Sequence, residues 1–166
     1  MFNTSLNKEV NWLQILIGIS ALVIGVVLYL LDRPSGQTYF VPESISLFEE
    51  TSKLFGMAGE HLPTFLHVFG FCLITCGILT QNRWVALGVC SFWVLLDGLF
   101  EIGQHPAIAS LIVEHIPGWF NNVPILENTQ AYFLSGRFDP MDLLSVLLGG
   151  ILAYVVVIIT PKTQKI

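Results

Sequence analysis

Four stretches of this chain are long, apolar and almost free of charged residues. They cover 12–31, 63–80, 84–104 and 141–160, and the first contains no charged residue at all. A helix needs about 20 consecutive apolar residues to cross the hydrocarbon core of a bilayer. The pattern therefore predicts an all-α membrane protein, a bundle of four transmembrane helices that forms a single domain over residues 1–166.

Composition supports this class and narrows the set of partners. The chain is 54% hydrophobic and only 11% charged, whereas soluble domains are about a quarter charged. Its net charge of −5 argues against binding to nucleic acid. We expect membrane lipids as partners, together with other membrane protein subunits if the chain belongs to a complex.

The first span predicts a retained anchor rather than a cleaved signal peptide. Its apolar core is longer than the ~7–15 residues of a signal sequence, and Asp32-Arg33-Pro34 follows where a small-residue cleavage site would stand. The basic residues of both termini and of the short 81–83 connection share one side, and indoles at positions 12 and 84 lie at the same interface. These features predict that both termini are cytoplasmic.

The two loops on the opposite side are more apolar than free loops. The segment 41–57 starts with Pro42 and Glu43, a helix-start signal, and predicts a helix lying in the membrane interface that Gly56 and Gly59 end. The segment 107–116 is too short to span and predicts a second interfacial or re-entrant turn. Both loops either rest on the membrane surface or cover a site beneath them.

Ionisable and amide residues interrupt the apolar pattern at one depth. Asp97, Glu101 and Gln104 have spacings that place them on one helical face. A charge at the centre of a bilayer costs roughly 2.5–3.5 kcal/mol, so such residues usually face a polar interior. The predicted topology brings seven residues near the outer surface, and we expect them to form an outward-facing pocket: His67, Asp97, Glu101, Gln104, Arg137, Asp139 and Asp142.

Each of these residues also has a structural interpretation, as polar contacts that hold helices together. Metal binding is not expected, because no His-Glu-x-x-His pair occurs on one helical turn. No cofactor is expected either, since bis-histidine haem needs two histidines at matching depth and only His67 lies within a span. Cys72, Cys76 and Cys90 are interpreted as small buried hydrophobic residues.

Two segments resemble a known family. Phe100–Gln104 (FEIGQ) and Ser135–Gly150 (SGRFDPMDLLSVLLGG), preceded by a histidine in the previous span, are similar to the VanZ-like family of small bacterial integral membrane proteins. The family's pattern falls on six positions: His67, Glu101, Gln104, Arg137, Asp142 and Gly149. The resemblance covers about 64–153. It departs at Pro63-Thr64, where the family commonly has Asp-Lys, and at Val146, where it commonly has Asn.

The resemblance implies a protein of the bacterial cytoplasmic membrane, since the family consists of small bacterial integral membrane proteins. The family is named for a member associated with low-level resistance to the glycopeptide antibiotic teicoplanin. Two functions follow from the sequence. In the first, the outward-facing pocket binds or acts on a polar headgroup or a cell-envelope component. In the second, the chain is a non-catalytic accessory subunit of a larger membrane complex. The sequence leaves open whether any reaction is catalysed.

Overall fold

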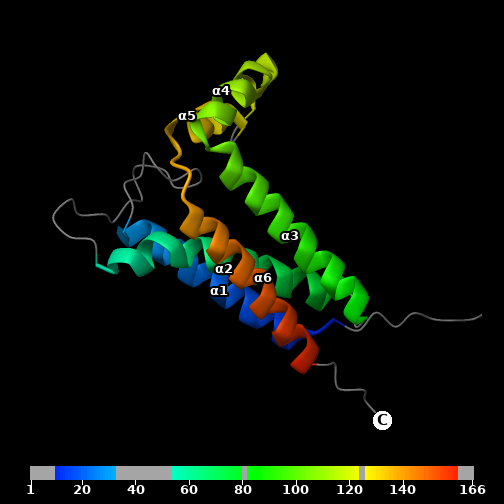
Figure 1. Ribbon diagram of the computed structural model, residues 1–166. Helices are drawn as coiled ribbons and strands as arrows, with labels where there is room; N and C mark the ends of the chain where they lie inside the picture. The colour runs from blue at the N-terminus through cyan, green and yellow to red at the C-terminus, as the bar shows by residue number, and fades with distance from the viewer. Residues whose placement is uncertain (1–9, 33–53, 80–81, 124–125, 161–166) are drawn as a thin grey trace, which may run out of the picture.

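Four long helices dominate the structure. The computed structural model describes residues 10–32, 54–79, 82–123 and 126–160, and no strand occurs in these ranges. The long helices are α1 (Trp12–Asp32), α2 (Gly56–Leu79), α3 (Arg83–Gly103) and α6 (Pro140–Ile159) (Figure 1). Each is long and apolar enough to cross a membrane. The predicted fold class, a four-helix membrane bundle, is confirmed.

The helices run alternately up and down, which defines two ends of the bundle. The hairpin end contains the start of α1, the short connection from α2 to α3, and the last turn of α6. The cap end contains the opposite termini of the same helices. Beyond the end of α3, the cap itself contains α4 (Pro106–Glu114), η3 (Gly118–Asn122), η4 (Leu126–Asn128) and α5 (Thr129–Ser135) (Figure 1).

The second span is the one whose start differs from the prediction. Helix α2 begins at Gly56, whose φ of 51° favours glycine, and continues through Pro63. The prediction that a helix break at Gly59 precedes the span is therefore wrong, because Gly59 lies inside α2, whereas Gly56 is the first residue of this helix. The predicted surface helix over 41–57 otherwise lies mostly outside the described residues. The segment 107–116, predicted as an interfacial or re-entrant turn, forms the short helix α4 over most of its length.

Asp32 explains why α2 starts where it does. Its side chain is buried, and its Oδ1 accepts hydrogen bonds from the backbone N–H groups of Leu54 (2.6 Å) and Phe55 (3.3 Å). The carboxylate at the end of α1 thus satisfies donors just before α2, and a negative charge at a helix N-terminus is stabilising. A Cβ on Gly59 would lie 1.8 Å from Asp32 Oδ2, so only glycine leaves room for this contact.

Helix α2 lies at the centre of the packing. It makes its most extensive contact with α1 and its next with α6, whereas α3 packs mainly on α6 and more loosely on α2. Close approach depends on glycine: a Cβ on Gly149 of α6 would lie 2.7 Å from the Phe65 carbonyl oxygen of α2. Buried Val68, Cys72, Leu73 and Cys76 of α2 form the middle of the core.

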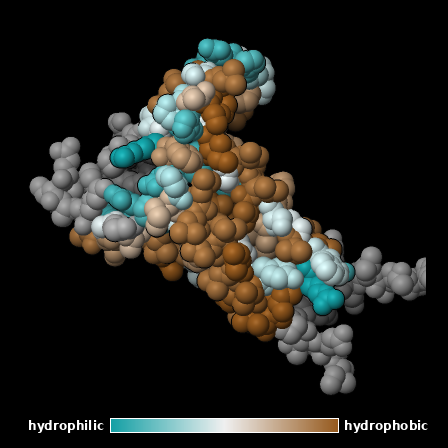
Figure 2. Space-filling model, in the orientation of Figure 1, coloured by the Kyte–Doolittle hydropathy of each residue, from teal (hydrophilic) through white to brown (hydrophobic). Residues whose placement is uncertain are grey.

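Amide side chains close the hairpin end. Asn11 Nδ2 donates to the Thr160 carbonyl oxygen (2.9 Å), and Gln14 Nε2 donates to the Thr160 hydroxyl (3.0 Å). These bonds hold the start of α1 against the end of α6. Figure 2 shows the apolar surface along the helices and hydrophilic residues gathered towards the two ends, as expected for a chain that crosses a bilayer.

Candidate functional site

The polar residues of the spans meet in pairs across the seams between helices. His67 of α2 bonds Asp97 of α3, with 2.7 Å between Nδ1 and Oδ2. His61 of α2 bonds Asp142 of α6, with 2.9 Å between Nδ1 and Oδ1. Both histidines come from α2, six positions apart, and therefore face different neighbouring helices.

Glu101 joins the third seam, between α3 and α6. It is buried, and its Oε1 accepts a hydrogen bond from the backbone N–H of Asp139 (3.0 Å). Asp139 in turn is the N-cap of α6, where its Oδ1 accepts from the backbone N–H of Met141 (2.9 Å). The sequence Asp-Pro at this point is a helix-start signal, because the carboxylate caps and Pro140 occupies the first helical position.

These contacts follow one another around the cap end of the bundle. Asp97 and Glu101 are one turn apart on α3, and Asp139 and Asp142 lie at the start of α6. We call the set the polar belt; its members are His61, His67, Asp97, Glu101, Asp139 and Asp142. The sequence prediction included all of these residues except His61.

Gln104 and Arg137 lie at the edges of the belt. The side chain of Gln104 hydrogen-bonds Tyr132 of α5. Burial raises the pKa of Tyr132 to about 12, so its hydroxyl stays protonated at neutral pH. Arg137 is exposed and makes no ion pair with any residue that the structure describes. Asp97 and Asp142 already pair with histidines, and Glu101 already accepts from a backbone N–H.

The His67–Asp97 dyad differs from the rest of the belt in being open at the surface. The His67 side chain is 48% exposed, whereas that of Asp97 is 12% exposed. Nδ1 is engaged by Asp97, and within the described ranges Nε2 has no partner. By contrast, the His61 and Asp142 side chains are 16% and 14% exposed. One ring nitrogen of the belt therefore remains available on the membrane-facing side.

The dyad occupies the end of a regular ladder between α2 and α3. Along α2 the ladder residues are spaced by four: His67, Phe71, Thr75 and Leu79. Along α3 they are spaced likewise: Val85, Val89, Trp93 and Asp97. Phe71 stacks on Trp93 with ring centroids 4.7 Å apart, next to the dyad. Antiparallel helices joined by a short turn align such steps, so this spacing is a signal from which the His67–Asp97 pair could have been predicted.

The dyad has a defined chemical capacity. When the imidazole is neutral, a carboxylate that accepts from Nδ1–H fixes the tautomer in which Nε2 carries a lone pair. Such a nitrogen accepts a hydrogen bond from a hydroxyl or ammonium group, or removes its proton as a general base. Among the residues described, no three histidine, cysteine or acidic side chains lie close enough together to hold a metal ion.

Fold and site together define a multi-pass helical membrane protein with a histidine–aspartate dyad open on one side of its bundle. Comparison of the chain with protein-family models, curated proteins and solved structures gives no match.

Proposed function

We propose that this protein is VanZ-like and binds, or acts on, the polar headgroup of a lipid or lipid-linked cell-envelope component at His67 and Asp97. One observation carries the proposal: the imidazole of His67 is half-exposed at membrane depth, and its Nε2 is free of partners among the described residues. Its location in the bacterial cytoplasmic membrane, with both termini cytoplasmic, belongs to the same proposal.

Depth makes the open nitrogen significant. Asp97 lies 14 positions beyond Arg83, the first residue of α3, which corresponds to about 21 Å of helix. The hydrocarbon core is ~30 Å thick, so the dyad lies within it, nearer the cap end. A polar group without a partner there costs several kcal/mol. A ligand that donates a hydrogen bond to Nε2 removes this cost.

The charge of the dyad selects the class of headgroup. Asp97 places a carboxylate behind the imidazole, so an incoming anion meets a like charge, whereas a hydroxyl or ammonium group meets an acceptor. We therefore propose a headgroup that carries hydroxyl or amino groups. The resemblance to the VanZ-like family supports an envelope component and a link to glycopeptide resistance.

The proposal is tested by identifying what the purified protein retains. Mass spectrometry under non-denaturing conditions, after exchange into a mild detergent, should show a bound lipid-like molecule on the wild-type protein. His67→Phe combined with Asp97→Asn removes the acceptor without leaving an unpaired charge, and it should abolish retention. His105→Phe, in the exposed cap, is the matched control and should retain the molecule. Equal retention by the wild type and the double variant would contradict the proposal.

An accessory subunit is the second candidate. It is favoured by the engagement of most of the polar belt within the chain itself, at His61–Asp142 and Glu101–Asp139, which is how structural polar contacts behave. In this case a donor from a partner helix covers His67. Different membrane proteins that co-purify with the wild type and not with the double variant would support this function over headgroup binding.

A further inference from the structure

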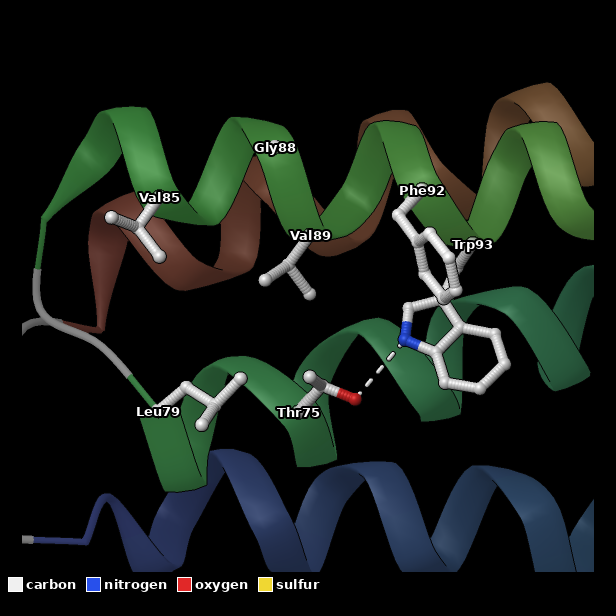
Figure 3. A pocket seen from close by; sticks show the side chains of 7 residues that line it. All are labelled: Thr75, Leu79, Val85, Gly88, Val89, Phe92 and Trp93. Carbon is white, nitrogen blue, oxygen red and sulfur yellow. Dashed lines mark hydrogen bonds between the residues drawn. The ribbon is translucent and has the colours of Figure 1, made fainter.

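The seam between α2 and α3, the loosest of the three that the polar belt crosses, contains an open groove. It lies between α2 and α3, from the aromatic step of the ladder to the hairpin end, and has a volume of about 450 Å³. This volume falls within the range of ~300–1,000 Å³ typical of small-molecule sites. Seven residues line it, as Figure 3 shows: Thr75, Leu79, Val85, Gly88, Val89, Phe92 and Trp93.

We propose that this groove holds one hydrocarbon chain of the lipid whose headgroup binds His67 and Asp97. The inference rests on the proposed function for the headgroup and assigns the tail a separate site. A single amphiphile would then follow the α2–α3 ladder, with its polar end at the dyad and its chain directed towards the hairpin end.

One aromatic step of the ladder, Phe71 against Trp93, separates the dyad from the groove. The His67 and Phe71 rings meet edge to face with centroids 4.6 Å apart, and Phe71 stacks on Trp93, which lines the groove. From His67 to Leu79 the ladder rises about 18 Å along the helix axis, at ~1.5 Å per residue. Half of the hydrocarbon core is about 15 Å thick, so a chain of that length extends past Thr75, which lies about 12 Å from His67 along the helix, and enters the groove.

The side chains that line the groove favour an apolar occupant. Thr75 is its one polar aliphatic side chain, and its hydroxyl oxygen accepts a hydrogen bond from Trp93 Nε1–H (3.1 Å; Figure 3). That bond also satisfies the indole. Because the Thr75 oxygen and the Trp93 N–H are already joined by this hydrogen bond, an occupant of the groove needs no polar atoms. Acyl and prenyl chains have none.

A hydrocarbon chain suits the groove better than a transmembrane helix of a second copy. Helices approach closely in membranes through small residues, but this groove is walled by Leu79, Phe92 and Trp93 and contains only one glycine, Gly88. A Cβ built on Gly88 meets nothing within 4 Å, so the space beside it is open. A flexible chain fills a narrow space that a helix of large side chains does not enter.

Gly88 allows the groove to be filled without disturbing the core. In Gly88→Phe the ring should occupy the groove. Gly88→Ala supplies at least as large a gain in helix propensity with a single methyl group, and Leu87→Phe places the same ring at the neighbouring exposed position. The probe is phosphatidylethanolamine with a photoreactive diazirine at the end of one acyl chain, in vesicles of phosphatidylethanolamine and phosphatidylglycerol. Cross-linked peptides are mapped by mass spectrometry.

The wild type, Gly88→Ala and Leu87→Phe should cross-link at Val85 and Val89, and Gly88→Phe should reduce the yield by about tenfold, equivalent to ~1.4 kcal/mol. Unchanged labelling in Gly88→Phe would overturn the inference. If Gly88→Phe loses labelling while His67→Phe with Asp97→Asn keeps it, the chain site stands and the headgroup proposal fails. If Gly88→Phe keeps labelling while His67→Phe with Asp97→Asn loses it, the chain site is refuted and the headgroup proposal stands.

Discussion

Two carboxylates one turn apart on α3 have different contacts. Glu101 is buried and accepts from the Asp139 backbone, so it holds α3 against the start of α6. Asp97 orients a half-exposed imidazole. On the sequence alone, Glu101 falls on the family pattern while Asp97 lies one turn deeper and off that pattern, which predicts the more structural role for Asp97. The contacts favour the opposite assignment.

This assignment predicts different outcomes for two isosteric variants. Glu101→Gln keeps an oxygen that accepts from Asp139, so its stability should change by only about 0.6 kcal/mol, the average for interhelical polar contacts in membranes, and lipid retention should persist. Asp97→Asn should reduce retention, because an amide does not fix the imidazole tautomer as a carboxylate does. Thermal unfolding in detergent and mass spectrometry of retained lipid measure both. Full loss of retention in a folded Glu101→Gln protein would contradict the assignment.

An added methyl group at Gly59 should be damaging. A Cβ there would lie 1.8 Å from Asp32 Oδ2, so Gly59→Ala should displace the carboxylate from the backbone donors at Leu54 and Phe55. We expect a loss of about 1–3 kcal/mol in the free energy of unfolding, typical of overpacking. Gly88→Ala, in open space, is the control. Similar stability of the two variants in denaturant titrations would refute the role assigned to Gly59.

At the scale of helices, the ends depend on side chains from neighbouring segments. Asp32 satisfies donors just before α2, and Asp139 caps α6 while its own backbone N–H binds Glu101. The start of α6 is thus joined to α3 through one residue. Side-chain hydrogen bonds of this kind define the first residue of each helix more precisely than the hydropathy of the sequence does.

The N-cap residue of α6, Asp139, gives a prediction at this scale. Asp139→Ala removes the acceptor for the Met141 N–H and should lower the free energy of unfolding by about 1 kcal/mol. Asp139→Asn retains a capping oxygen and should remain close to the wild type. Denaturant titration monitored by circular dichroism provides the comparison, and equal stabilities for Ala and Asn at this position would exclude a capping role.

The sequence predicts the helices well and the contacts between them less well. Runs of apolar residues define the four spans because the bilayer requires a fixed length of helix. The start of α2 was missed because it depends on Asp32, which is distant in sequence. His61 was missed as a partner of Asp142 because pairing across helices depends on rotation about each axis, which hydropathy does not report. The His67–Asp97 pair was accessible through the four-residue ladder.

For the whole molecule, orientation in the membrane is the central prediction. Basic residues at Lys8, Arg83, Lys162 and Lys165 favour the hairpin end as cytoplasmic and the cap as external. Asn121→Cys places a thiol in the exposed part of the cap, while the three native cysteines are buried. An impermeant maleimide should therefore label Asn121→Cys in intact cells. Labelling only after lysis would reverse the orientation and place the dyad nearer the cytoplasmic leaflet.

The short turn between α2 and α3 also matters while the chain is being made. Helices α2 and α3 are adjacent in the chain and therefore leave the ribosome in succession. Because His67 and Asp97 lie at equal distances on either side of Asn82, the two residues face each other when these helices align as a hairpin. Asp97 alone would cost roughly 2.5–3.5 kcal/mol to place at the centre of a lone helix. Entry of both helices as one unit supplies its partner at once, before α6 has been synthesised. We therefore expect the dyad to lower the cost of inserting Asp97 into the membrane.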